Sequence, residues 1–166
     1  MPRRTVFAIS AITMVAAVGV GPGAIWTLFG SPDLGPVEFG TLTRRSTPND
    51  SLAAAPDLCP ARSDVLPPEF AADAKMLRTV FGTMLTSEAS VERVATDDAG
   101  LTDRYVQRSA LMRYPDTVVV QFFDRPDGRS TLALYSRSQI GRNDFGANRA
   151  RIERWLGKLR ALAPVA

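Results

Sequence analysis

Apolar residues at steps of three and four positions mark the segment 71–88, and they are Leu77, Val80, Phe81, Met84 and Leu85. Because an α-helix turns once every 3.6 residues, these side chains fall on one face. Gly82 lowers the helical propensity slightly. The pattern predicts an amphipathic α-helix over this segment.

From residue 91 the pattern changes to the short β-branched and apolar runs that are typical of strands. Residues 91–95 and 101–109 predict two strands, and Thr117–Phe123 predicts the clearest one, since it is β-branched and aromatic almost throughout. The next segment, 124–129, contains Pro126 and an Asp-Gly pair, which favour a reversal of the chain. We therefore expect a β-hairpin at this point.

The second strand of the hairpin, residues 131–136, alternates between two faces. One face carries Leu132, Leu134 and Ser136, and the other carries Ala133 and Tyr135. This period of two residues is that of a strand with a different environment on each side.

A last helix is predicted over residues 144–162, with Asp144 as its N-cap. We expect one side to be apolar, with Phe145, Ile152, Trp155, Leu156 and Leu159. The other side and its flanks carry Arg149, Arg151, Arg154, Lys158 and Arg160. Strands grouped between two helices indicate an α+β class, an antiparallel sheet of three to four strands with two helices packed on one face.

The N-terminal residues 1–30 form a separate unit. Residues 5–30 carry no charge and follow Arg3 and Arg4, so the stretch is long enough for a transmembrane helix with its C-terminal side outward. The Gly21-Pro22-Gly23 break leaves a cleaner run of about 16 residues, a length also found in cleaved signal peptides. An anchor, a signal peptide and a buried helix stay open as alternatives.

Residues 31–69 contain seven of the twelve prolines and are expected to be extended, because proline lacks an amide donor and restricts its neighbour. Their many apolar residues indicate that part of the segment lies against the domain of residues 70–166. Cys59 is expected to be either buried or an exposed thiol able to pair between chains.

Composition removes several classes of function. The 166 residues include no histidine and one cysteine, which excludes His-based nucleophile activation, His-ligated metal sites and internal disulfides. We expect no metal and no cofactor. The net charge is +3, but basic residues alternate with acids, so no nucleic-acid partner is expected.

One stretch is distinctive, Tyr135 to Ile152, with the sequence YSRSQIGRNDFGANRARI. It resembles the uncharacterised bacterial domain-of-unknown-function family 1499, whose signature has a strand ending in Ser-Arg-Ser, then Gly-x-x-Asp-hydrophobic-Gly-x-Asn and an arginine-rich helix. The resemblance covers roughly residues 38–162. It implies no activity, but members are often exported or membrane-attached.

The same stretch yields the candidate ligand site, because arginines beside a helix N-terminus suit an anion. Its residues are Arg108, Ser136, Arg137, Ser138, Arg142, Asn148 and Arg149. The alternative is structural: Asp144 caps its own helix and Arg137 pairs with a carboxylate such as Asp116.

The sequence thus predicts a bacterial inner-membrane, single-pass protein whose C-terminal domain faces the periplasm. Its function would be binding or scaffolding, without catalytic residues. Its partners would be the membrane and an anionic small molecule, a lipid headgroup or an acidic protein. A hydrolase-type envelope enzyme that uses Arg, Asp and Ser residues is the alternative. The oligomeric state stays open.

Overall fold

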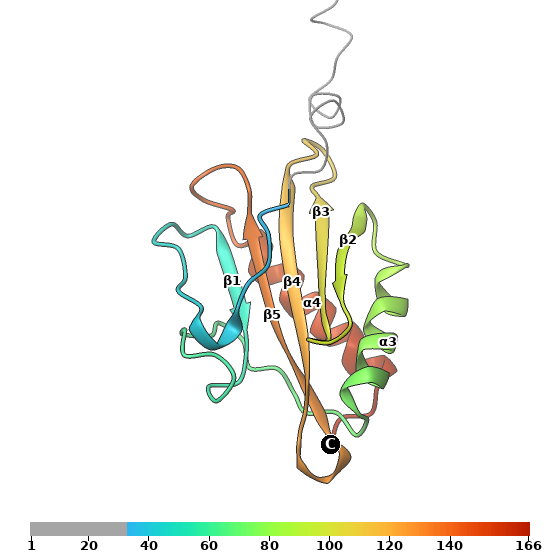
Figure 1. Ribbon diagram of the computed structural model, residues 1–166. Coiled ribbons are helices and arrows are strands. Elements are labelled where there is room, and N and C mark those ends of the chain that lie inside the picture. Colours follow the sequence, from blue (N-terminus) through green and yellow to red (C-terminus); the bar gives the residue numbers. More distant parts are fainter. Residues whose placement is uncertain (1–32) are drawn as a thin grey trace, which may run out of the picture.

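The strands and helices follow the predicted order in the computed structural model, which describes residues 33–166 (Figure 1). The elements are η1 (Phe39–Thr41), β1 (Asp50–Ala53), α3 (Ala74–Leu85), β2 (Val91–Asp97), β3 (Thr102–Arg108), β4 (Pro115–Asp124), η2 (Pro126–Gly128), β5 (Ser130–Ser138) and α4 (Ala147–Leu162). They form one antiparallel sheet of five strands in the order β1-β5-β4-β3-β2. The α+β class is confirmed.

The predicted hairpin is formed by β4 and β5, which pair from Asp116↔Ser138 to Asp124↔Ser130. The turn between them contains η2, in which Asp127 has φ +65° and Gly128 φ +73°. Glycine adopts such a conformation without a steric cost, which explains the Asp-Gly pair at this place.

The sheet has one more strand than the largest number expected. The additional strand, β1, lies in the proline-rich segment and pairs with β5 at the edge of the sheet. It occupies the proline-free stretch between Pro48 and Pro56, and an edge strand needs amide donors on one side only. Leu52 and Ala53 are fully buried there, so packing stabilises a strand that periodicity could not reveal.

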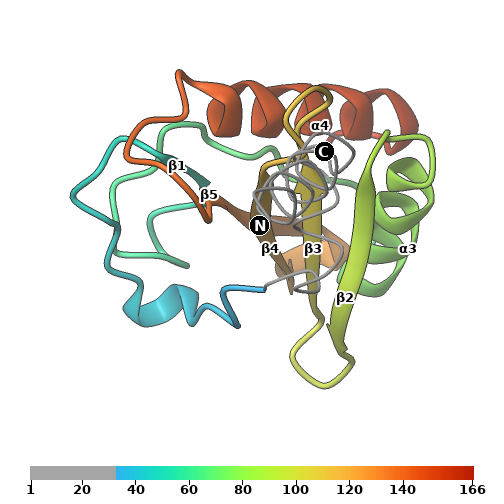
Figure 2. The same cartoon turned by 90° about the horizontal axis from the view of Figure 1, so that it is seen from above.

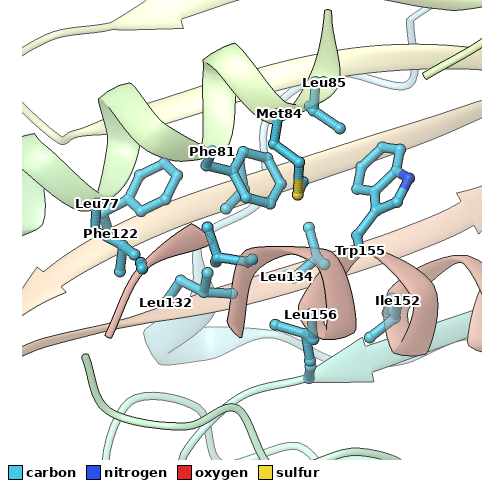
Figure 3. Packing of buried hydrophobic residues seen from close by; sticks show 14 of the residues in the cluster. Leu77, Phe81, Met84, Leu85, Phe122, Leu132, Leu134, Ile152, Trp155 and Leu156 are labelled. Atoms are coloured by element: carbon cyan, nitrogen blue, oxygen red, sulfur yellow. The ribbon is translucent and has the colours of Figure 1, made fainter. Parts of the chain in front are cut away.

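Helices α3 and α4 cover one face of the sheet (Figure 2). Phe81 of α3 lies at the centre of this core, with edge-to-face contacts to Tyr105, Phe122 and Trp155 at ring-centroid distances of 6.2, 5.6 and 5.9 Å. Figure 3 shows Leu132 and Leu134 of β5 beneath the two helices. Burial of these large side chains is the main source of stability on this face.

The opposite face is covered by the proline-rich segment itself. Phe39, Leu52 and Cys59 pack with Ala133 and Tyr135 of β5. The expected alternation along β5 is thus confirmed, as is the expectation that this segment lies against the domain. Cys59 is 2% exposed, so of its two expected roles the structure shows the buried one.

Helix α4 differs from the expectation at three residues. Phe145 was placed on the apolar face, but it lies before the helix begins and is 94% exposed. Arg151 was placed among the solvated residues, but it is buried. The N-cap residue is Gly146 rather than Asp144. Periodicity cannot distinguish an exposed arginine at the edge of a helical face from an arginine that is buried because it pairs with a carboxylate of another element.

The predicted membrane segment lies outside the described residues. Within residues 33–166, no helix is long and apolar enough to cross a bilayer.

Candidate functional site

The three residues of the Ser-Arg-Ser motif do not share one environment. Ser136 and Ser138 face helix α4 and are buried. Arg137 faces the opposite side of the sheet, because successive side chains of a strand point to opposite faces. The motif therefore contributes to two separate sets of contacts.

On the helix side, Asn148 at the start of α4 organises a buried polar network. Its Oδ1 atom accepts the Ser136 hydroxyl at 2.6 Å. Its Nδ2 group donates to Ser138 Oγ at 3.0 Å, to the Asn49 carbonyl at 3.1 Å and to Asp144 Oδ2 at 2.7 Å. The amide thus joins β5, the residue preceding β1 and α4 through bonds that saturate it.

Arg151, one turn further along α4, completes this network. Its guanidinium donates to Asp116 Oδ2 at 2.5 Å, to Ser136 Oγ at 2.6 Å and to Asn148 Oδ1 at 2.7 Å. It also donates to the Gln107 side chain. Asp116 therefore pairs with Arg151 and not, as one alternative held, with Arg137. A buried charge pair of this kind persists where each charge is hydrogen-bonded.

Asp144 occupies the place that an anion would need at the start of α4. Its carboxylate accepts the backbone amides of Gly146 at 3.0 Å and Asn148 at 2.9 Å. Free amides in the first turn are what makes a helix start attractive to anions. This geometry agrees with the alternative in which the motif is structural. The Asp144 side chain accepts the first amides of α4, although the residue at the N-cap position is Gly146.

Arg137 lies beneath the first described residues of the chain. Its Nη2 group donates to the carbonyls of Leu34 and Gly35 at 3.0 and 2.8 Å, and its guanidinium carbon lies 5.7 Å from the centroid of the Tyr135 ring. Burial lowers the pKa of Arg137. Its role in the structure is to bind the N-terminal part of the described chain to the sheet.

The other predicted site residues lie apart from these two groups. Arg108 pairs with Glu92 at 3.3 Å, and Arg149 pairs with Glu153 one helical turn away at 2.9 Å. Arg142 is an exposed residue in the loop between β5 and α4. Of the seven predicted residues, the structure brings Ser136, Ser138 and Asn148 together, in a network that is closed by other partners.

A different region has the geometry of a ligand site. Helix α3 contacts β4 and β5 and leaves an open cleft of about 880 Å³ beside β2 and β3, a volume within the usual range for small-molecule sites. From α3 and the residue that follows it, the lining comprises Lys75, Arg78, Thr79, Gly82, Thr83, Leu85 and Thr86. From β2, β3 and the turn between them it comprises Val91, Arg93, Thr96, Asp98, Leu101 and Tyr105.

A β-bulge in β2 determines which side chains face this cleft. Arg93 pairs with Tyr105, whereas Ala95 pairs with Arg104 and Thr96 with Asp103. The extra residue shifts the alternation by one position. Thr96 consequently lines the cleft, and its hydroxyl donates to Asp103 Oδ1 at 3.1 Å.

Tyr105 gives the cleft an unsatisfied polar atom. Its side chain is 3% exposed, and its hydroxyl has no hydrogen-bond partner in the described part of the chain. Burial raises the pKa of Tyr105 to about 12, and the Arg93 guanidinium across the strand pair opposes only part of that rise. Buried hydroxyls are normally paired. This one has almost no accessible surface and lies beside the Arg93 guanidinium, so a molecule in the cleft would reach it only after a side chain at the margin moves.

The charges of the cleft are mainly basic. Arg78 forms two bonds to the buried Asp103 carboxylate, at 2.9 and 2.8 Å, and one to Asp98 at 3.0 Å. The hydrogen bonds with Asp103 raise the pKa of Arg78. Lys75 and Arg93 lie exposed at the margin of the cleft, where they are accessible to an anionic group.

Sequence reasoning did not find this site. Tyr105 lies in the predicted strand 101–109, and the only signal for the cleft was its place opposite Arg93 on the paired strand. The bulge that aligns Thr96 with the cleft has no sequence marker, because no glycine or proline accompanies it. Among residues 33–166, no group of three or more Asp, Glu, Cys or His side chains is arranged to hold a metal ion.

Residues 43–159 match the protein family described as "Protein of unknown function (DUF1499)". The match covers more than two thirds of the chain, which therefore belongs to that family, as the motif from Tyr135 to Ile152 indicated. No curated protein matches the sequence.

Proposed function

We propose that this member of the DUF1499 family is a membrane-attached binding protein of the cell envelope, without catalytic activity. Its ligand is a small molecule with an anionic group, held in the cleft between α3 and the strands β2 and β3. The cleft replaces the start of α4 as the binding site.

The basic margin of the cleft around the buried Tyr105 hydroxyl is the observation that carries this proposal. Leaving a buried hydroxyl without a full hydrogen bond costs about 1–3 kcal/mol, and a ligand acceptor that displaces the neighbouring Arg93 side chain would recover that cost. With a pKa near 12, the hydroxyl stays protonated at neutral pH. Tyr105 is therefore suited to donate a hydrogen bond and not to act as a general base.

The margin of the cleft supports an anionic ligand. Lys75, Arg78 and Arg93 stand against the single acid Asp98 among the lining side chains, and Arg78 already binds Asp98 and Asp103. Lys75 and Arg93 are then left to approach a carboxylate or phosphate.

The contacts of Ser138, Asp116 and Arg137 argue against the hydrolase alternative. A hydrolase built on Ser138, Asp116 and Arg137 would need the three side chains in one cleft. In the described chain, Ser138 binds Asn148, Asp116 binds Arg151, and Arg137 lies on the other face of the sheet.

Membrane attachment is proposed from the uncharged stretch 5–30 and from the two arginines that precede it. The charge rule favours the C-terminal domain on the outer side, here the periplasmic side of a bacterial inner membrane. A cleft on that side would meet solutes or lipid-derived molecules of the envelope.

Thermal unfolding of the full chain in mild detergent tests the binding proposal. The probes are inorganic phosphate, sulfate, glycerol 3-phosphate and adenosine monophosphate. At 100 times its dissociation constant a bound probe stabilises the protein by about 2.7 kcal/mol, which corresponds to a rise of several degrees in Tm. We expect at least one probe to give this rise.

Two tyrosine variants then locate the effect. Tyr105→Phe removes only the unpaired hydroxyl and should abolish or strongly reduce the rise, while Tyr114→Phe, outside the cleft, should leave it unchanged. An absence of any rise, or an equal rise in Tyr105→Phe and the parent, would contradict the proposed site.

A further inference from the structure

Two loops meet at one end of the sheet, and together they form what we call the loop end. They are residues 109–114, between β3 and β4, and residues 139–146, between β5 and α4. Their bases are joined by the bond from the Gln139 amide to the Pro115 carbonyl, at 3.2 Å. Both loops lie at the top of the molecule in Figure 1.

The loop end concentrates exposed apolar side chains. Half of the ten large hydrophobic residues that are exposed within residues 33–166 belong to these two loops, namely Leu111, Met112, Tyr114, Ile140 and Phe145. Leu111 and Phe145 are 87% and 94% exposed, more than any other large hydrophobic residue in that range. Exposed apolar residues gathered in this way indicate a contact with a partner or a membrane.

The described chain begins at the same end. The Leu34 amide donates to Thr117 Oγ1 at 3.2 Å, and the Arg137 guanidinium donates to the Leu34 carbonyl at 3.0 Å. Thr117 and Arg137 form the strand pair next to Asp116↔Ser138, the last pair before the loops. The N-terminal entry and the two loops are thus neighbours.

The uncharged stretch 5–30 ends three residues before Asp33. Three residues span at most about 11 Å when fully extended. If that stretch lies in a bilayer, the loop end is the part of the domain that a short connection holds nearest to the lipid.

The charges of this end suit an anionic surface. Arg113 lies in the first loop, where one of its Nη groups donates to Ser90 Oγ at 2.6 Å, and Arg142 lies in the second. Arg45 lies in the neighbouring segment and donates to the Ser138 carbonyl at 2.8 Å. The one acid of the two loops is Asp144, whose carboxylate is occupied by the amides at the start of α4. Arginines beside exposed aromatic residues are typical of segments that lie at a lipid headgroup layer.

We infer that the loop end docks onto the bilayer surface, with Leu111 and Phe145 inserted among the headgroups and Arg113 and Arg142 bound to anionic lipids. The docking rests on the membrane attachment proposed above, and it is independent of the cleft. It holds the domain in one orientation, with the α3–β2–β3 cleft along the side of the molecule.

Site-specific fluorescence on the full chain in vesicles tests the inference. In a Cys59→Ala background, the substitution Leu111→Cys or, as the matched control, Met76→Cys carries an environment-sensitive dye. Met76 is 56% exposed, and it lies in the first turn of α3, at the opposite end of β4. The vesicles contain phosphatidylcholine with or without phosphatidylglycerol, and a fraction of the lipid carries a quencher near the headgroup.

We expect strong quenching and a blue-shifted emission for the dye at position 111, and neither effect at position 76. Phosphatidylglycerol should increase the quenching at 111, and Arg142→Gln should remove part of that increase. Arg129→Gln, near the opposite end, should not.

Each failure points to a different cause. Extraction of the unlabelled chain from the vesicles by alkaline carbonate would overturn the membrane attachment and the docking together. Firm attachment with equal, weak quenching at positions 111 and 76 would overturn the docking alone. A blue shift at 111 without lipid quenching, rising with protein density, would assign the loop end to a second copy of the chain and so overturn the inference.

Discussion

The network at the start of α4 and the cleft beside α3 are both polar regions on the helix face of the sheet. They differ in how many of their polar groups have a hydrogen-bond partner within the protein. In the network, Asn148 and Arg151 bind partners on β3, β4, β5 and the residue before β1, so its groups are satisfied within the fold. In the cleft, the Tyr105 hydroxyl is buried and unpaired in the described chain. The comparison teaches that the distinctive motif of a sequence can specify packing. The polar groups that remain incompletely bonded lie in segments that carry no distinctive motif.

The largest expected effect comes from Arg151→Ala in the network. The variant leaves the Asp116 carboxylate, which is 8% exposed, without its charged partner, and such a change costs about 3–5 kcal/mol. Urea unfolding followed by circular dichroism measures the loss. Arg149→Ala, two residues away with an exposed ion pair, is the control and should cost less than about 1 kcal/mol. Similar losses in both variants would show that the buried Arg151–Asp116 pair contributes no more to stability than an exposed ion pair.

The cleft should make the protein sensitive to alkaline pH. The pKa of Tyr105 is raised from 10 to about 12 in the folded state by burial, so above pH 10 the unfolded chain loses this proton first. Stability is then fully present below pH 10 and declines between pH 10 and pH 12, by about 2–3 kcal/mol from this group.

Unfolding midpoints measured from pH 8 to pH 11.5 test this dependence. Tyr105→Phe should flatten the decline and, because it removes an unpaired hydroxyl, should unfold at a higher urea concentration at pH 8. A variant as sensitive to alkali as the parent would mean that other groups, such as Tyr135, whose pKa burial also raises, dominate.

A smaller effect is expected from Asp144→Ala at the margin of the network. The change removes the acceptor of two amides in the first turn of α4 and of the Asn148 side chain. Loss of a capping side chain costs about 0.5–2 kcal/mol. The Tm of the variant measures the cost, and Glu153→Ala, which removes only an exposed ion pair in the same helix, serves as the control. A Tm equal to that of the parent would show that the Asp144 side chain does not stabilise the network.

The smallest effect, and one of opposite sign, is expected from Gly82→Ala in the cleft wall. A Cβ atom at this position meets nothing within 4 Å, and alanine favours a helix interior over glycine by about 1 kcal/mol. The variant should therefore be more stable in urea, with probe binding little changed. Gly82→Phe should fill part of the cleft and weaken binding, whereas unchanged probe binding in Gly82→Phe would place the ligand elsewhere.

The sequence was sufficient for the elements that show their own periodicity. Helix α3, the β4–β5 hairpin and the two faces of β5 follow from spacing alone. A buried face requires apolar residues at every second position of a strand, and at steps of three and four positions in a helix. It was not sufficient for β1, which has four residues between prolines and is stabilised by contacts with β5 that no local pattern encodes. It also placed Phe145 inside a helical face, because the positions before the first helical turn continue the same spacing.

The predicted site residues also fall into those that the sequence could place and those that it could not. Sequence reasoning identified Ser136, Ser138 and Asn148 as a group, and they do meet. Arg137 could have been separated from them by the alternation along β5. Arg149 could also have been separated, because Glu153 lies four residues later on the same face of the helix. Arg108 and Arg142 could not, since nothing in the sequence shows which loop or carboxylate lies beside them.

What the sequence by itself determined is the α+β class, the order of the main elements, the family and the exclusion of histidine chemistry. The tertiary structure alone decided that Arg151 is buried against Asp116, that the bulge in β2 aligns Thr96 with the cleft, and that the Tyr105 hydroxyl has no partner in the described chain. The physical reason is the range of the interactions. Periodicity and turn preferences act over a few residues, whereas the pairing of a charge or a hydroxyl depends on groups that only the folded chain brings together.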